Sequence, residues 1–91
     1  MYRNTYQITE DILDNLAKTG QTGIPVTSLL RQSNLSYSRL TIFVNKLTQS
    51  GLINKVEVKN KNIFIITEKG RLYLDEYKKF SSIAESFGLE L

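Results

Sequence analysis

The chain has 91 residues, of which 41% are hydrophobic and 23% charged, and its formal net charge is +3. This length suits one small domain with a single core. Cysteine and histidine are both absent, which argues against disulfides, zinc, copper or haem sites and against Ser-His or Cys-His catalysis. No apolar run has the length of a membrane span or signal peptide. We therefore expect a cytoplasmic protein that is not an enzyme and has no metal or cofactor.

The first expected helix covers residues 4–19. Asn4 is followed three positions later by Gln7, a pattern typical of a capping box at a helix start. Apolar residues at helical spacing predict its buried face, namely Ile8, Ile12, Leu13 and Leu16. In the connector that follows, we expect residues 23–24 to pair briefly as an edge strand.

Two further helices are expected over residues 26–33 and 36–50, with a turn at Asn34 between them. Ser36 can cap the second of these helices through its hydroxyl, and Gly51 can end it in the left-handed conformation. One side of this helix is apolar at steps of three and four, through Leu40, Phe43, Val44 and Leu47. A short helix, a turn and a longer helix form the order of a helix-turn-helix motif.

After Gly51 the period changes from helical to alternating, which predicts a β-hairpin over residues 52–67. Its second strand is rich in β-branched residues and apolar on both faces, so both faces should be covered. We expect the polar residues 59–62 to form the turn. Thr67 can cap a last helix over residues 68–87, in which Gly70 predicts close backbone packing.

Positive charge is concentrated in the middle of the chain. Residues 31–71 carry eight Lys or Arg against two Glu, a net charge of +6, whereas residues 1–30 have a net charge of −1 and residues 72–91 of −2. The segment that holds the third helix and the hairpin therefore has the electrostatic character of a polyanion-binding surface. A lysine-rich solvated surface is the alternative interpretation of this charge.

Several short motifs stand at positions typical of one fold: Leu35-Ser36-Tyr37, Leu40, Phe43-Val44, Leu47, Gly51-Leu52-Ile53 and Ile66-Thr67-Glu68-Lys69-Gly70. Through them the chain resembles the small archaeal winged helix-turn-helix proteins, which include chromatin-associated DNA-binding proteins. The resemblance implies an α+β, mainly α fold with three helices, a two-stranded β-hairpin wing and a C-terminal dimerisation helix. It also implies double-stranded DNA as the partner, with the reading helix at residues 36–50 and the wing at residues 55–62.

The predicted DNA-binding residues lie on the polar side of the third helix, at the hairpin tip and at the end of the second helix. Arg39 is the strongest single candidate, because arginine is the commonest side chain to read guanine. Lys46 and Arg31 better suit phosphate contacts, which position a protein without reading sequence. The full predicted set is Arg31, Ser36, Tyr37, Ser38, Arg39, Thr41, Ile42, Asn45, Lys46, Lys59, Asn60 and Lys61.

The last helix carries apolar residues in a heptad-like pattern, which predicts a homodimer interface. Part of this face should pack against the first helix of its own chain, but its second half extends beyond the compact domain. Exposing several large apolar groups together is unusual in a monomer. The predicted interface residues are Tyr73, Tyr77, Phe80, Ile83, Ala84 and Phe87.

The leading functional prediction is a homodimeric transcriptional regulator, associated with the nucleoid, that binds double-stranded DNA. Two alternatives stay open: an abundant architectural or chromatin DNA-binding protein, and a winged-helix protein-interaction module without strong DNA binding. The mixed polar side of the third helix favours sequence reading, because an architectural binder needs only positive charge.

Overall fold

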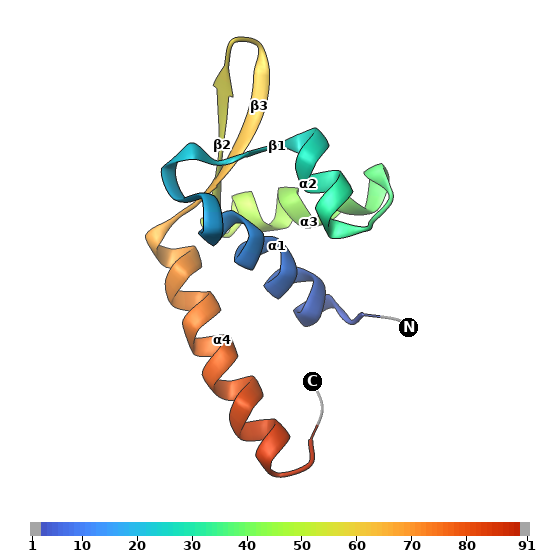
Figure 1. Cartoon of the computed structure of the whole chain (residues 1–91), viewed down its shortest axis with the longest axis vertical. Helices are drawn as coiled ribbons and strands as arrows, with labels where there is room; N and C mark the ends of the chain where they lie inside the picture. The colour runs from blue at the N-terminus through green and yellow to red at the C-terminus, as the bar shows by residue number, and fades with distance from the viewer. Residues whose placement is uncertain (1–2, 90–91) are drawn as a thin grey trace.

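The computed structural model describes residues 3–89. Its elements in chain order are α1 (Thr5–Thr19), the 3₁₀ turn η1 (Gly20–Thr22), β1 (Ile24–Pro25), α2 (Val26–Ser33), α3 (Tyr37–Gln49), β2 (Ile53–Val58), β3 (Lys61–Ile66) and α4 (Glu68–Ser86). The molecule is elongated, with extents of 48 × 28 × 21 Å. In Figure 1 the β2–β3 hairpin stands at one end of the long axis, α4 extends to the other, and α1, α2 and α3 lie between them. The predicted mainly helical α+β fold is confirmed.

The helix starts follow local capping chemistry. Asn4 and Gln7 form the predicted capping box before α1. The hydroxyl of Ser36 accepts a hydrogen bond from the amide of Arg39 at 3.2 Å, and the hydroxyl of Thr67 accepts one from the first turn of α4 at 3.0 Å. Each cap pairs a backbone donor that the helix itself leaves free, so these starts are determined within a few residues of sequence.

The wing contains one strand more than the predicted two-stranded hairpin. The sheet is antiparallel with the order β1-β3-β2, and Ile24 and Pro25 of β1 lie opposite Phe64 and Ile63 of β3. The predicted pairing at residues 23–24 is therefore shifted by one position. Pro25 is tolerated because β1 is an edge strand, where a missing amide donor costs little.

The hairpin turn contains two residues, so the predicted four-residue turn is wrong. Val58 lies opposite Lys61, and the strand pairing continues up to these two residues. Lys59 and Asn60 have positive φ angles of 50° and 64°, as in a type I′ turn, whose twist matches that of the strands. Asparagine tolerates this conformation but lysine does not favour it, so the sequence alone did not indicate such a short turn.

The core is formed by the inward faces of the four helices and the sheet. Its buried members are Ile8, Ile12, Leu13, Leu16, Ile24, Leu29, Leu40, Phe43, Val44, Leu47, Leu52, Ile53, Phe64, Ile66 and Leu74. The predicted apolar faces of α1 and α3 are both among them. Because α3 is held by one side only, its opposite side is left in solvent.

The start of α4 packs closely against the segment that follows α3. A Cβ atom added to Gly70 would lie 2.1 Å from the backbone oxygen of Leu52. The hydroxyl of Thr67 donates to the backbone oxygens of Gly51 and Leu52 at 2.6 and 3.0 Å. The predicted close packing at Gly70 is confirmed, and it connects α4 to the C-terminal end of α3.

The far end of α4 is closed by a turn. The amide of Leu89 donates to the oxygen of Ala84 at 2.8 Å, and that of Gly88 to the oxygen of Glu85 at 2.9 Å. This pair of hydrogen bonds is a Schellman motif, in which the residue after the turn packs back on the helix. Among the helices of residues 3–89, none is both long and apolar enough to cross a membrane.

Candidate nucleic-acid interface

The buried side of α3 determines which of its residues face solvent. Its four core residues are at most 8% exposed. At about 100° of rotation per residue, the opposite direction belongs to four exposed residues, here called the outer stripe: Ser38, Ile42, Asn45 and Gln49. The hydroxyl and amides of the outer stripe can hydrogen-bond base edges, and the 54% exposed Ile42 can contact a thymine methyl.

Two flanks border the outer stripe. By the same rotation, Arg39 and Lys46 lie on one flank, and both are exposed. The other flank faces the wing across a groove of about 340 Å³, whose lining includes Thr41, Thr48 and the wing residue Lys55. Arg39, the strongest candidate from the sequence, therefore stands beside the outer stripe, on the side away from the wing.

The groove adds residues to the predicted DNA-binding set. Lys55, Asn62, Thr48 and Gln49 line it, and none of them belonged to the predicted set. Lys55 pairs in register with the buried Phe64, which places its side chain on the strand face that looks toward α3. The alternating pattern of the strand predicted that Lys55 lies on the opposite face from Val56. Only the strand register showed that this face looks toward α3.

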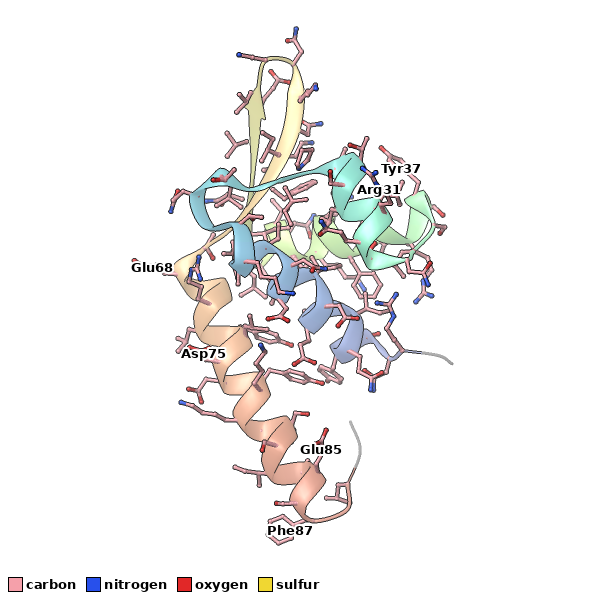
Figure 2. The ribbon with its side chains drawn as sticks, viewed as in Figure 1. Arg31, Tyr37, Glu68, Asp75, Glu85 and Phe87 are labelled. Atoms are coloured by element: carbon pink, nitrogen blue, oxygen red, sulfur yellow. The ribbon has the colours of Figure 1, made fainter. Side chains whose placement is uncertain are left out.

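Some predicted hydroxyls are already engaged within α3. The hydroxyl of Thr41 donates to the backbone oxygen of Tyr37 at 2.8 Å. The hydroxyl of Ser36 caps the helix and lies 3.3 Å from that of Ser38. Tyr37 is 65% exposed at the start of α3, and Figure 2 shows it near Arg31 on the side formed by α2 and α3, far from Phe87 at the end of α4.

The tip of the wing forms a second hollow with the start of α2. Lys59 and Asn60 form the turn, and Lys61 begins β3. Asn60 and Lys61 line a hollow of about 580 Å³ together with residues 25–28. Lys61 therefore lies beside α2 and Lys55 beside α3. The two faces of the wing thus place a positive charge next to each helix of the helix-turn-helix motif.

Salt bridges within residues 3–89 are confined to α1, α4 and Arg3, which precedes the capping residue of α1. They are Arg3–Asp11 at 2.6 Å, Lys78–Asp14 at 2.8 Å and Lys79–Glu76 at 3.4 Å. In the same range, no salt bridge involves the cations of α2, α3 or the wing, namely Arg31, Arg39, Lys46, Lys55, Lys59 and Lys61. Figure 2 shows the carboxylates of Asp75 and Glu85 along α4, away from those cations. The charge of α3 and the wing is thus available to an external anion.

The described residues, 3–89, hold no group of three or more His, Cys, Asp or Glu side chains that could bind a metal ion. Asp11 and Asp14 of α1 instead pair with Arg3 and Lys78. Burial raises the pKa of Glu10, and the neighbouring carboxylates of Asp11 and Asp14 add to this effect while Lys78 opposes it. The acidic side of α1 is thus largely engaged in contacts with its own chain.

The predicted dimer residues on α4 fall into two groups. Phe80 and Ile83 are each 58% exposed and Phe87 is 78% exposed. Tyr73 and Tyr77 are half-buried and stack with each other, at a ring-centroid distance of 6.3 Å. Ala84 is only 5% exposed, and its backbone oxygen accepts a hydrogen bond from the amide of Leu89 in the Schellman turn. The exposed apolar surface of α4 is therefore carried by its second half, together with Leu72, which is 62% exposed.

Helices α2 and α3, the hairpin and the exposed polar side of α3 define the chain as a winged helix-turn-helix protein. A family model described as "Winged helix-turn-helix" matches residues 2–85. The chain therefore belongs to the winged helix-turn-helix family, as its motifs predicted. No curated protein matches the sequence.

Solved structures agree with this family. Sso10a-2, a DNA-binding protein from Sulfolobus solfataricus, is 26% identical with a TM-score of 0.79, over 93% of this chain and 85% of that one. The transcriptional repressor CouR, bound to a 23-mer DNA duplex, is 19% identical with a TM-score of 0.73, over 89% of this chain and 56% of that one. SSV1 F-93 is 19% identical with a TM-score of 0.66, over 88% and 91%. At 19% identity, the likenesses to CouR and to SSV1 F-93 show a shared fold only.

Proposed function

We propose that the chain is a homodimeric transcriptional regulator that binds double-stranded DNA through α3 and the wing. The observation that carries this proposal is the set of cations without salt bridges on α2, α3 and the wing, placed around the exposed outer stripe. Two likenesses support it, because Sso10a-2 is a DNA-binding protein and CouR is a repressor bound to DNA. Association with the nucleoid would follow from the same activity.

In this proposal α3 lies in the major groove, which is about 12 Å wide and admits a helix. The outer stripe then faces the base edges. Arg39 and Lys46 on one flank, and Lys55 with the groove residues on the other, reach the two phosphate backbones that border the groove. Lys59 and Lys61 extend the contact along the backbone, and Arg31 adds a phosphate contact from the end of α2.

The composition of the outer stripe favours a regulator over an architectural protein. Asn45 and Gln49 carry amides that can pair with adenine, and Ile42 offers an apolar group to a thymine methyl. All three are exposed. A protein that binds DNA only by charge needs none of these groups, because phosphate contacts supply its affinity.

The DNA-binding proposal is tested by titrating a fluorescent random duplex with the protein over a series of salt concentrations. We expect the logarithm of the affinity to fall linearly with the logarithm of salt, and each lost phosphate contact to reduce the slope by about 0.9. The variants are Arg39→Ala, Lys46→Ala and the pair Lys59→Ala/Lys61→Ala. Lys79→Ala, which removes the same charge from α4, is the matched control and should leave the slope unchanged. No binding by the wild type at low salt would contradict the proposal.

The homodimer is proposed to form through the exposed apolar residues of α4. Phe80, Ile83 and Phe87 lie beyond the body of the domain, and a second copy would remove them from water. A two-fold dimer would present two α3 helices to successive major grooves, about 34 Å apart. Sedimentation analysis should show a dimer for the wild type and a monomer for Ile83→Lys/Phe87→Lys, whereas Ser82→Lys on another side of α4 should stay dimeric. A monomeric wild type at micromolar concentration would exclude this interface.

A further inference from the structure

A hollow lies between the N-terminal part of α1 and the middle of α4, on elements that do not contribute to the proposed DNA surface. Its volume is about 420 Å³, and its lining consists of Tyr6, Tyr73, Glu76, Tyr77 and Phe80. Small-molecule sites commonly measure about 300–1,000 Å³. The hollow therefore has the size of a site for a small molecule, and four of its five lining side chains are aromatic.

The aromatic rings form an ordered array. The rings of Tyr6 and Tyr77 have centroids 6.2 Å apart and an interplanar angle of 15°, and those of Tyr73 and Tyr77 lie 6.3 Å apart at 4°. Tyr6 of this array is 59% exposed, as is the neighbouring Phe80 at 58%, whereas Tyr73 and Tyr77 are half-buried. Ring faces that remain accessible carry the negative part of the aromatic quadrupole, which attracts a cation.

Three carboxylates lie near the array. Glu76 lines the hollow, and Glu10 and Glu85 lie near enough to Tyr77 to help raise its pKa, after burial, which is the largest cause. Figure 2 shows Glu85 on the side of α4 that is nearer α1, and Asp75 on the other side. An anion in this hollow would be repelled by these carboxylates, whereas a cation would be stabilised by them.

Two lysines also lie near the hollow. The ammonium of Lys78 is engaged by Asp14 at 2.8 Å. That of Lys79 lies 3.4 Å from Glu76, with side chains 71% and 62% exposed. Such an exposed pair contributes little, so a ligand cation placed against the rings can replace Lys79 as the partner of Glu76.

We propose that this hollow binds a small organic cation, an ammonium group carried on an apolar body. The faces of Tyr6 and Tyr77 would contact the ammonium and its apolar substituents, and the carboxylate of Glu76 would supply the opposite charge. Phe80, which the proposed dimer would cover, only borders the hollow. The size of the hollow, its aromatic lining and the carboxylate of Glu76 select this class of ligand. The proposal does not depend on DNA binding, because none of these residues belongs to α3 or to the wing.

The proposal is tested with three probes that share one ring and differ in charge: benzyltrimethylammonium, benzyl alcohol and phenylacetate. Binding to the full chain is measured by calorimetry, and the resonances of the tyrosine rings are followed by NMR. We expect the cation to bind about tenfold more tightly than phenylacetate, with benzyl alcohol between them. Shifted ring resonances of Tyr6 and Tyr77 should accompany binding. Equal or tighter binding of phenylacetate, or no binding of the cation, would overturn the proposal.

Charge and ring contributions are separated by conservative variants. Glu76→Gln keeps the shape of the hollow and should weaken the cation about fivefold to tenfold while leaving benzyl alcohol unchanged. Glu57→Gln, which removes one carboxylate from the wing, is the matched control and should change neither. Tyr77→Phe should retain binding because the ring remains. The proposal would be overturned if Glu76→Gln weakened the cation and benzyl alcohol equally. It would also be overturned if cation binding were lost as the protein dimerises, because a second copy would then fill the hollow.

Discussion

The ammonium of Lys78 on α4 lies 2.8 Å from the carboxylate of Asp14 on α1. These residues are 64 positions apart in the chain, and their contact joins α4 to α1 outside the core. The stacking of Tyr6 on Tyr77 joins the same two helices. The direction in which α4 leaves the body therefore depends on surface contacts as well as on Leu74 in the core.

The first prediction concerns the free energy that couples Lys78 and Asp14. Both side chains are almost half exposed, so water screens the pair and we expect a coupling of about 0.5 kcal/mol. Urea unfolding of Lys78→Met, Asp14→Asn and the double variant gives this coupling through a double-mutant cycle. The same cycle on the more exposed Lys79 and Glu76 should give a smaller value. A coupling near zero would show that the contact does not form in solution.

The second prediction is a loss of stability at alkaline pH. Burial raises the pKa of Tyr73 and Tyr77 above the ordinary 10.0, and the hydrogen bond to Asp14 raises the pKa of Lys78 above 10.5. The folded state therefore keeps these protons at a pH at which the unfolded state loses them. The stability that these three groups contribute is fully present below their ordinary pKa values. It is lost as the pH rises through their raised pKa values in the folded state.

This loss is measured as the melting temperature across the alkaline range. The wild type should begin to lose stability near pH 10. Tyr77→Phe, which keeps the ring and removes the titrating group, should show a shallower decline. An unchanged decline in this variant would mean that Tyr77 is as solvated in the folded chain as in the unfolded one.

The third prediction concerns Gly70. An added Cβ would meet the oxygen of Leu52 at 2.1 Å, a backbone atom that cannot move aside without disturbing the junction of α3 and α4. We expect Gly70→Ala to reduce the free energy of unfolding by about 3 kcal/mol. Gly88→Ala is the control, because no atom lies within 4 Å of its added Cβ and only its φ of +76° is strained. Its cost should stay near 1 kcal/mol. Similar costs in both variants would refute the clash.

The fourth prediction separates the stability of the wing from its charge. Lys59 has a φ of 50° at the first position of the type I′ turn, where asparagine is favoured. Lys59→Asn should raise the free energy of unfolding by about 0.5–1 kcal/mol and should weaken binding to duplex DNA at low salt. Chemical denaturation and fluorescence titration measure the two effects. If both properties moved in the same direction, either the turn geometry or the proposed phosphate contact would be wrong.

The fifth prediction distinguishes the outer stripe from its flank. Lys46→Ala should weaken binding to all duplexes by a similar factor, because it loses a phosphate contact. Asn45→Ala should weaken only a selected high-affinity duplex, at a cost of about 1–3 kcal/mol, and leave random DNA almost unchanged. Sequence enrichment followed by titration tests this difference. Uniform weakening by Asn45→Ala would favour an architectural protein.

Much of the fold could be predicted from features that act over a few residues. The caps at Asn4, Ser36 and Thr67 depend on one side chain and an amide three positions away. The buried side of α3 follows from apolar residues spaced three and four apart, a pattern contained within the helix itself. The two-residue turn of Lys59 and Asn60 could not be predicted in this way, because strand pairing, rather than residue preference, holds a lysine in the left-handed region.

The sequence by itself therefore determined the family, the helices and the basic segment that holds α3 and the wing, since periodicity, capping and charge are properties of neighbouring residues. Only the tertiary structure decided which residues from distant segments meet. It placed Lys55 across a groove from α3, buried Ala84 near the end of α4, and brought Tyr6 against Tyr77 beside an aromatic hollow. Such contacts depend on strand register and on the angle at which α4 crosses α1, and both are set by packing between segments that the linear pattern does not relate.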